Sequence, residues 1–369
     1  MITQKEIAEV VKKYGKEITV GTLGGHSALD VCRGAKDEGL RTAVVCQKGR
    51  EKTYSKYYKR IVDKVIVVDK FADIAKEDVQ EKLRKLNTVF VHSRYFWVYC
   101  NFGEIENKFL VPIFGTRQLV RKEERDEEKN QYFLLEAAGI KTPKRFVYPK
   151  DIDRLALVKA AEASRGYERA FFFAANEAEY REKGKGLTKK GTITEEGLKK
   201  ARIEEFVTGA PVNFNFFYSP LTGETELLGT DIRRQTNIDG MLRLTAPEQN
   251  EILKHDKVKY IETGHVAVTV KESLLEKAYE AAEAFVKATQ KHYPPGIIGP
   301  FALQGAISAG PPKEELVVFD ASMRIPGSPG TRYTPYMNYL YGKDVSAGRR
   351  IAMEIKKAIK ENKLGKIVT

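Results

Sequence analysis

The sequence has few cysteines, no long apolar run and no low-complexity tract, and each shortage excludes a class of protein. Its three cysteines, Cys32, Cys46 and Cys100, are widely spaced and form neither a zinc-binding pattern nor a disulfide framework. No run approaches the ~20 apolar residues needed to span a bilayer. Residues 1–16 lack the apolar segment and cleavage site of a secretory signal. We therefore expect a cytoplasmic protein with no membrane partner.

The chain is basic overall, but its charges are not gathered into a tail. Its 63 Lys and Arg residues accompany 50 Asp and Glu residues, which gives a formal charge of +13 and a pI of about 9.3. Basic tails, zinc fingers and basic-region helices, the usual signs of nucleic-acid binding, are missing. Phosphorylated small molecules require only local positive charge. We therefore expect such ligands as partners, and no nucleic acid.

The beginning of the chain predicts a strand, a helix and a second strand. Residues 17–23 (EITVGTL) are apolar and β-branched, residues 28–39 have a helical pattern, and residues 42–46 (TAVVC) predict the next strand. This βαβ order is typical of a parallel sheet that binds ligands at the carboxyl ends of its strands. His26 and Ser27 lie at such an end, beside a helix N-terminus that can bind an anion. The alternative for His26 is a helix cap.

Two further loops follow predicted strand ends. Lys48 and Arg50 come after the second strand and have the composition of a phosphate clamp. Ser93 and Tyr95 follow the strand at residues 87–92. Because parallel strands end at one edge of a sheet, the three loops are expected to converge on one small-molecule site. The alternative for the lysine and arginine is a solvated loop.

The middle of the chain predicts a β-hairpin that covers phosphates. Strands at residues 155–159 and 170–174 flank a loop of small residues, with Lys159 as a counter-ion for a nucleotide. A later strand carries Glu204 and Glu205. The other elements that we expect are helices at 119–138, 177–183, 195–201, 272–291 and 346–362, and antiparallel strands at 212–219, 224–231, 241–245 and 265–270.

A late hairpin carries the residues best suited to a metal ion. Residues 301–308 and 316–324 flank a turn-forming segment. Side chains two apart share one face of a strand, so Asp320 and Arg324 are expected to project together. Gln304 on the facing strand presents an amide oxygen near the carboxylate, and such a pair suits Mg²⁺. The alternative is the solvent-facing side of an edge hairpin.

The order of these elements, a βαβ segment, a lid hairpin, an acidic strand and a late metal-binding hairpin, resembles that of the ATP-grasp superfamily. Within it, the chain closely resembles the archaeal formate-dependent synthetases of 5-formaminoimidazole-4-carboxamide ribonucleotide (FAICAR). The resemblance is strongest in seven segments: TLGGHSALDVCRGAKDEG (22–39), VPIFGTRQLVR (111–121), RIEEFVTG (202–209), FYSPLTGETELLGTDIRRQTNIDG (217–240), PPGIIGPFALQ (294–304), LVVFDASMRI (316–325) and GRRIAMEIKKAI (348–359).

The resemblance implies an α/β and α+β chain with an ATP-grasp fold and an N-terminal Rossmann-like domain with a parallel sheet. It places this substrate-binding domain at residues 1–120, a lid subdomain at 121–208 and the core with the metal-binding hairpin at 209–369. It implies formylation of the aminoimidazole carboxamide ribonucleotide (AICAR) with ATP and formate, through formyl phosphate, in purine biosynthesis. Mg²⁺ or Mn²⁺ and a homo-oligomer are implied as well.

The resemblance also implies roles for individual residues. The implied catalytic residues are His26 and Arg324, and the metal ligands are Gln304 and Asp320. The expected substrate contacts are His26, Ser27, Lys48, Arg50, Ser93, Tyr95 and His265. The expected nucleotide contacts are Lys159, Arg165, Glu204, Glu205, Val207 and Gln235.

Several positions differ from the family pattern. The lid loop has one glycine, Gly166, where relatives are glycine-rich. Tyr95 replaces a serine, His265 an asparagine, Gln235 a glutamate and Asp320 a glutamate. Two alternatives therefore accompany the leading interpretation: an ATP-grasp ligase for another amine acceptor, and a nucleotide-binding paralogue without ligase activity.

Overall fold

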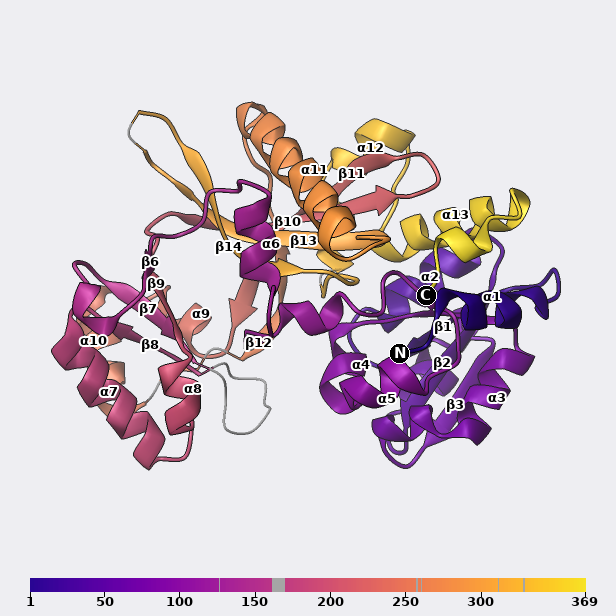
Figure 1. Cartoon of the computed structure of the whole chain (residues 1–369), viewed down its shortest axis with the longest axis horizontal. Helices are drawn as coiled ribbons and strands as arrows, with labels where there is room; N and C mark the ends of the chain where they lie inside the picture. Colours follow the sequence, from indigo (N-terminus) through magenta and orange to yellow (C-terminus); the bar gives the residue numbers. More distant parts are fainter. Residues whose placement is uncertain (126, 161–169, 257, 260, 311, 328) are drawn as a thin grey trace.

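The strands of the described residues form three sheets, which Figure 1 shows as separate bodies. The computed structural model describes residues 1–125, 127–160, 170–256, 258–259, 261–310, 312–327 and 329–369. Both chain termini lie at the body that contains the N-terminal sheet (Figure 1). Within these residues, no helix combines the length and the apolar character needed to cross a membrane.

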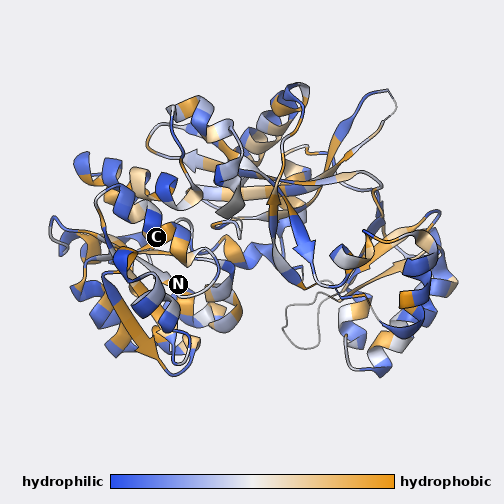
Figure 2. Cartoon of the chain, turned by 180° about the vertical axis from the view of Figure 1, so that it is seen from behind, coloured by the Kyte–Doolittle hydropathy of each residue, from blue (hydrophilic) through white to orange (hydrophobic). Residues whose placement is uncertain are grey.

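The N-terminal sheet is parallel, as predicted, with the strand order β3-β2-β1-β4-β5. Every residue of β1 is buried, which explains its continuous apolar, β-branched sequence. Hydrophobic residues concentrate on these strands, while the surrounding helices are mixed (Figure 2). The elements are β1 (Thr19–Leu23), β2 (Arg41–Gln47), β3 (Lys64–Val68), β4 (Thr88–Val91), β5 (Ile113–Phe114), α1 (Gln4–Lys12), α2 (Ala28–Asp37), α3 (Glu77–Lys85), α4 (Arg94–Tyr99) and α5 (Phe102–Asn107).

The core sheet is antiparallel, with the order β12-β11-β10-β13-β14. Its apolar face packs against α11 and α6 through Phe214, Phe216, Phe285, Phe301 and Leu134. The strands are β10 (Ala210–Ser219), β11 (Glu224–Gln235), β12 (Glu262–Ala267), β13 (Gly299–Ser308) and β14 (Glu315–Ser322), and the helices beside them are α6 (Gln131–Ala137), α11 (Leu275–His292) and α12 (Tyr336–Tyr341). Two helices of the same part of the chain, α9 (Ile238–Met241) and α10 (Ala246–His255), lie at the body of the lid sheet, and α13 (Ala347–Lys360) lies at the N-terminal body (Figure 1).

The third sheet lies in the predicted lid and has the order β6-β9-β7-β8. Its small core comprises Phe146, Val158, Phe172, Tyr180 and Ile203. The elements are β6 (Arg145–Phe146), β7 (Ala156–Lys159), β8 (Phe171–Ala174), β9 (Arg202–Glu205), α7 (Glu177–Lys189) and α8 (Glu195–Lys199). Short 3₁₀ turns occur at Lys59–Ile61, Phe71–Ala75, Val120–Glu123, Pro149–Asp151, Glu272–Leu274, Pro329–Tyr333 and Leu364–Lys366, and a π turn at Thr53–Tyr57.

The last helix of the chain, α13, packs against α2 of the N-terminal domain. The two helices approach so closely that a Cβ on Gly34 would overlap the backbone of Gly348 and Arg349. Beyond α13, the backbone of Thr369 exchanges hydrogen bonds of 3.0 and 2.9 Å with Ile113 in β5. The C-terminal segment therefore completes the first domain, and the predicted domain limits at 120 and 208 stay a proposal.

Some predicted elements are wrong. The expected helix at 119–138 begins only at Gln131, because the side chain of Asn130 accepts a hydrogen bond from Tyr132 N and caps α6 there. The expected strand at 241–245 instead contains the end of α9 and a turn. The helix expected at 177–183 continues to Lys189.

Candidate active site at the carboxyl ends of the parallel strands

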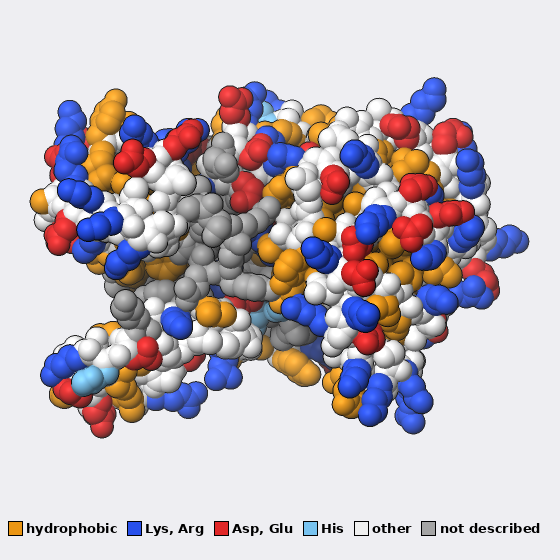
Figure 3. All heavy atoms as spheres, turned by 90° about the horizontal axis from the view of Figure 1, so that it is seen from below, with side chains coloured by type: hydrophobic (Ala, Val, Ile, Leu, Met, Phe, Trp, Pro, Cys, Tyr) orange, Lys and Arg blue, Asp and Glu red, His pale blue; other side chains and the backbone are white. Residues whose placement is uncertain are grey.

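Two adjoining cavities lie among the described residues, where the three sheets meet. The strand-end cavity, of about 280 Å³, is bounded by the loops after β1 and β4 and by β11 and β12. The hairpin cavity, of about 270 Å³, is bounded by β7, β9 and β14. Both walls include Phe171, Arg233, Gln304, Ser322 and Arg324. On the face shown in Figure 3, acidic and basic side chains are interspersed.

The loop after β1 is held against the C-terminal loop 325–327. Ser27 has a positive φ of 72° and donates a hydrogen bond of 3.0 Å from its Oγ to the Pro326 carbonyl. Ser27, not His26, occupies the N-cap position of α2, so the helix-cap alternative for His26 is wrong. His26 instead projects into the strand-end cavity, with its Nε2 3.7 Å from Glu262 Oε1. Burial lowers the pKa of His26, and Glu262 opposes that shift.

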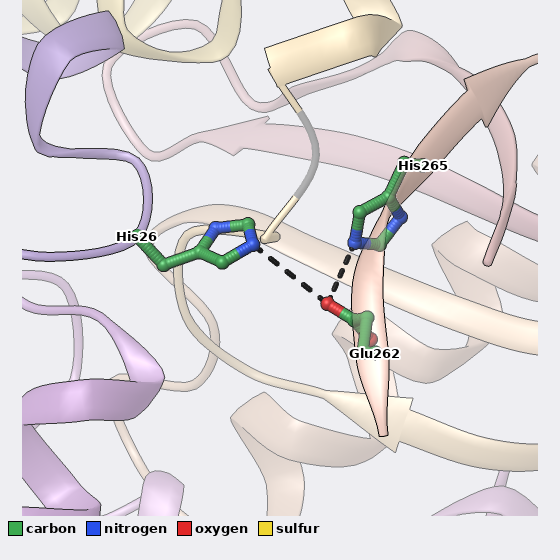
Figure 4. Close-up of side chains that lie close together, drawn as sticks. All are labelled: His26, Glu262 and His265. Atoms are coloured by element: carbon green, nitrogen blue, oxygen red, sulfur yellow. Dashed lines mark hydrogen bonds and ion pairs between the residues drawn. The ribbon is translucent and has the colours of Figure 1, made fainter. Parts of the chain in front are cut away.

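His265 lies between two carboxylates. Its Nδ1 contacts Asp231 and its Nε2 lies 2.8 Å from Glu262 Oε1 (Figure 4). Burial by itself would lower the pKa of His265, but the hydrogen bonds to Asp231 and Glu262 raise it to about 9. Burial would raise the pKa of Glu262, whereas His265 and Arg233 together bring it to about 2. These groups therefore form a connected charged cluster.

Asp231 is fixed by neighbours on its own sheet. The side-chain amides of Asn213 and Asn215 donate hydrogen bonds of 3.0 and 2.6 Å to its two oxygens. Asp231 is 1% exposed, so these donors and His265 replace the water that the carboxylate loses. The cluster is consequently rigid on the side of the core sheet.

The predicted pairing of Gln304 and Asp320 is confirmed, since the two residues are direct partners in β13 and β14. Directly opposed residues share a sheet face, and both line the hairpin cavity. The Gln304 amide donates to Ser322 Oγ at 2.8 Å, and its oxygen accepts from Arg233. The solvent-facing alternative for this hairpin is therefore wrong.

A β-bulge beside Asp320 connects β14 to the lid. The register of β13 and β14 shifts at Gln304, which leaves Phe319 as the extra residue. Its carbonyl accepts a hydrogen bond of 3.1 Å from Lys159 Nζ. Lys159 also forms an ion pair with Glu204, and their side chains are 8% and 2% exposed. Arg202 Nε donates to the other Glu204 oxygen at 2.9 Å, so this buried charge has two cationic partners.

Arg324 lies past the end of β14, at the junction of the cavities. It follows the strand instead of belonging to it, because β14 ends at Ser322. Its contacts to Glu123 and to its neighbour's carbonyl are long, at 3.4 Å each. Its buried Nε has no hydrogen-bond partner within the part of the chain that the structure describes. Burial lowers the pKa of Arg324, and Glu123 opposes that effect.

The structure brings together most of the predicted site residues. The strand-end cavity is lined by His26, Ser27, Ser93, Tyr95, Gln235 and His265, and the hairpin cavity by Lys159, Glu204, Glu205, Val207 and Asp320. Lys48 and Arg50 are different: both are exposed, neither contributes to a cavity wall, and Arg50 lies over the Phe71 ring at 5.6 Å. Arg165 lies outside the described residues.

Several polar residues of the strand-end cavity were not predicted, among them Asn213, Asn215, Asp231, Arg233 and Glu262. The first four carry a signal, because they alternate with apolar or outward residues along β10 and β11 and so share a face. Glu262 is three residues from His265, which in a regular strand would place it on the other face. A register shift in β12 opposite Arg234 brings both toward the cavity.

Comparison with known proteins identifies the family. Residues 179–369 match the family model described as "Domain of unknown function (DUF1297)", and residues 20–146 match "Protein of unknown function (DUF1246)". The 5-formaminoimidazole-4-carboxamide-1-(beta)-D-ribofuranosyl 5'-monophosphate synthetase of Methanocaldococcus jannaschii is 40% identical over 372 residues, covering 100% of both chains. The chain belongs to the FAICAR synthetase family.

Solved structures agree with membership of the FAICAR synthetase family. The IMP biosynthesis protein PurP from Thermococcus kodakaraensis is 27% identical, with a TM-score of 0.70 over 95% of this chain and 100% of that chain. A biotin carboxylase domain from Hydrogenobacter thermophilus, in complex with MgADP, ADP and bicarbonate, is 13% identical. Its TM-score is 0.59 over 90% of this chain and 69% of its own. The predicted ATP-grasp fold is confirmed.

Proposed function

We propose that this protein formylates AICAR to FAICAR in purine (IMP) biosynthesis, using ATP and formate and releasing ADP and phosphate. One observation carries the proposal beyond family membership: Arg324 is buried where the two cavities join, with long contacts and an unpaired Nε. Its ion pair with Glu123, at 3.4 Å, leaves the Nε unsatisfied among the described residues, and a buried cation with such incomplete pairing is costly unless an anion completes its shell. The acyl phosphate formed between a nucleotide and an amine acceptor is such an anion.

The hairpin cavity is the proposed nucleotide site. Lys159 donates to a backbone carbonyl of β14 and pairs with Glu204, so its ammonium is held at the cavity wall near Asp320. This position suits the triphosphate. Glu205 ends β9 and Val207 follows it, and both line the same cavity, where we place the adenine. Gln235 lies across the junction, in the wall of the strand-end cavity.

Gln304 and Asp320 are the proposed ligands of a divalent cation. An amide oxygen and a carboxylate on facing strands fit Mg²⁺ or Mn²⁺, which take oxygen ligands and complete their shells with phosphate and water. Such an ion would supply positive charge to the triphosphate. The Gln304 side-chain oxygen accepts a hydrogen bond from Arg233, so the amide is oriented with its oxygen toward the cavity that Arg233 also lines.

The strand-end cavity is the proposed site of the ribonucleotide. Ser93 Oγ is buried there without a hydrogen-bond partner among the described residues, so a ligand atom would satisfy it. His26 and Tyr95 lie on the same wall, with ring centroids 6.4 Å apart, and offer flat surfaces to a heterocycle. His265, on β12, lines the same cavity, and we propose that it contacts the exocyclic groups of the ribonucleotide. Lys48 and Arg50 have no part in this arrangement.

The reaction proceeds in two displacements. A formate oxygen attacks the γ-phosphorus of ATP, the bond to the bridging oxygen of ADP breaks, and formyl phosphate forms. The 5-amino nitrogen of AICAR then attacks the formyl carbon, loses its proton, and phosphate departs. Arg324 contacts both cavities and is therefore placed to stabilise the negative charge that passes from one to the other. Positioning and charge neutralisation are the main contributions of the protein.

ADP release tests the proposal. With ATP, Mg²⁺ and formate, we expect ADP release that depends on AICAR, and its loss in Asp320→Ala. Asp78→Ala is the matched control, because Asp78 is an exposed carboxylate on α3 that pairs with Lys82 far from both cavities. Turnover with another amine but not AICAR would establish the different-acceptor alternative. Tight ATP binding without any turnover would establish the non-catalytic paralogue.

Assembly and location remain predictions. A homo-oligomer is expected from the family likeness, and light scattering coupled to size exclusion would measure it. A cytoplasmic location follows from the sequence composition alone.

A further inference from the structure

His26, Glu262 and His265 bring three ligand atoms together in the strand-end cavity. These atoms all lie within 4.8 Å of one another. The Glu262 Oε1 atom is 2.8 Å from His265 Nε2 and 3.7 Å from His26 Nε2 (Figure 4). The two imidazole rings are nearly perpendicular, at 82°, with centroids 5.9 Å apart. We propose that these residues bind a transition-metal dication such as Zn²⁺, at a site separate from the Gln304 and Asp320 pair.

The donor set matches that class of ion. Two imidazole nitrogens and one carboxylate oxygen are ligands of Zn²⁺, Co²⁺ or Ni²⁺, whereas Mg²⁺ prefers oxygen alone. Zinc–ligand bonds of ~2.0–2.1 Å in a tetrahedron place neighbouring donors ~3.3 Å apart. The two separations from Glu262 Oε1 lie on either side of that value, and the two histidine ligand atoms lie within 4.8 Å of one another. Small side-chain rotations would therefore close the site.

The surrounding contacts orient two of the three ligands. Asp231 contacts His265 Nδ1, which directs His265 Nε2 at Glu262; a carboxylate behind a metal-binding histidine is the usual supporting arrangement. Asp231 is held in turn by two asparagine side chains. Arg233 Nε lies 3.2 Å from Glu262 Oε2, which leaves Glu262 Oε1 to face the histidines. A group of side chains that only contacts water would not require such orienting hydrogen bonds.

The ion would connect two parts of the fold. His26 comes from the loop after β1, while Glu262 and His265 come from β12 of the core sheet. All three line the strand-end cavity, so a bound ion would present its remaining coordination position to a ligand there. A nitrogen or oxygen atom of the substrate is the fitting occupant.

Metal titration of the chelator-treated protein, without ATP, formate or AICAR, tests the proposal. Zn²⁺ is followed by calorimetry, and Co²⁺ by its visible absorption, which is intense for tetrahedral sites. We expect one tight ion per chain. Glu262→Gln and His265→Asn are each expected to weaken Zn²⁺ binding at least a hundredfold, and Asp231→Asn ten- to a hundredfold. Unfolding curves establish that each variant is folded.

Two controls make the result specific. His255→Asn removes an exposed histidine that pairs with Glu251 on α10, and is expected to leave Zn²⁺ affinity unchanged. Asp320→Ala is expected to retain Zn²⁺ binding. Equal Zn²⁺ affinity in wild type and the two ligand variants, or the absence of a tight ion, would overturn the proposal. Because no substrate is present, either failure leaves the ligase function untouched, and loss of ligase activity leaves this result untouched.

Discussion

The buried histidine beneath the site, His92, predicts a defined loss of stability in acid. It follows β4, is 3% exposed, and accepts a hydrogen bond of 2.8 Å at Nδ1 from Trp97 Nε1. Burial, with the nearby charges of Arg324 and Arg117, lowers the pKa of His92 to about 3. The folded state therefore keeps this ring neutral at pH values where the unfolded chain protonates it.

The sign and size follow from proton linkage. A depressed folded pKa contributes stability that is complete above the unfolded value of ~6.5 and is lost as the pH falls toward 3. Each pH unit below ~6.5 costs ~1.4 kcal/mol, so ~2.7 kcal/mol is lost at pH 4.5. Because pH 4.5 is above the folded pKa of about 3, His92 stays neutral in the folded state there, and nearly the full loss of stability over the two pH units is observed.

Urea unfolding at pH 7.0, 5.5 and 4.5 measures this loss. Trp97 is the only tryptophan and contacts His92, so its fluorescence reports the transition of the parallel-sheet domain. The comparison is His92→Asn, whose amide oxygen replaces Nδ1 as the acceptor but does not titrate. The stability difference between wild type and variant should change by ~2.7 kcal/mol between pH 7.0 and 4.5. Equal losses of stability in wild type and His92→Asn would refute the reasoning, because every other titrating group is common to the two proteins.

Three further predictions concern packing and charge. Arg350→Met should lower the free energy of unfolding by ~3–5 kcal/mol, since Arg350 makes bonds of 2.6 and 2.9 Å to the carboxylate of Glu226 in a buried network; an unchanged melting temperature would contradict this. Gly34→Ala should cost ~1–3 kcal/mol in urea unfolding, because α13 must move. Gly186→Ala, where the added methyl meets open space, should be neutral or stabilising instead. Lys159→Met should weaken ATP binding ~10–100-fold by calorimetry without changing AICAR affinity; equal losses for both ligands would indicate general damage.

The elements that could be predicted are those with a strong local signal. Residues 17–46 gave a correct strand, helix and strand, because apolar periodicity and the Gly-rich turn agree. Gln304 and Asp320 were placed on facing strands correctly because the turn signal marks the hairpin. Their direct pairing depends on the bulge at Phe319, since the register that continues from the turn would put Gln304 opposite Phe319. The helix predicted at 119–138 was wrong because its charged first half resembles a solvated helix, while the capping residue Asn130 decides where the helix begins.

Site residues could be predicted where the end of a regular strand positions them. They could not be predicted where a loop or a register shift positions them. A strand end places His26 and Ser93, but it does not say which way the following loop bends. Lys48 and Arg50 accordingly line neither cavity. The register shift in β12 brings Glu262 beside His265, and no periodic pattern contains such an extra residue.

The packing of α13 has a consequence for how the chain acquires its structure during synthesis. The hydrophobic cluster beneath β1 draws Val20, Val31 and Val89 from the first hundred residues and Ile351 and Ile355 from the last twenty. The ribosome therefore releases this partner of the first domain only after the whole core sheet has been synthesised. Until then the apolar face of α2 lacks the cover that α13 provides. A nonsense mutation that removes the final helix should thus damage the domain made first.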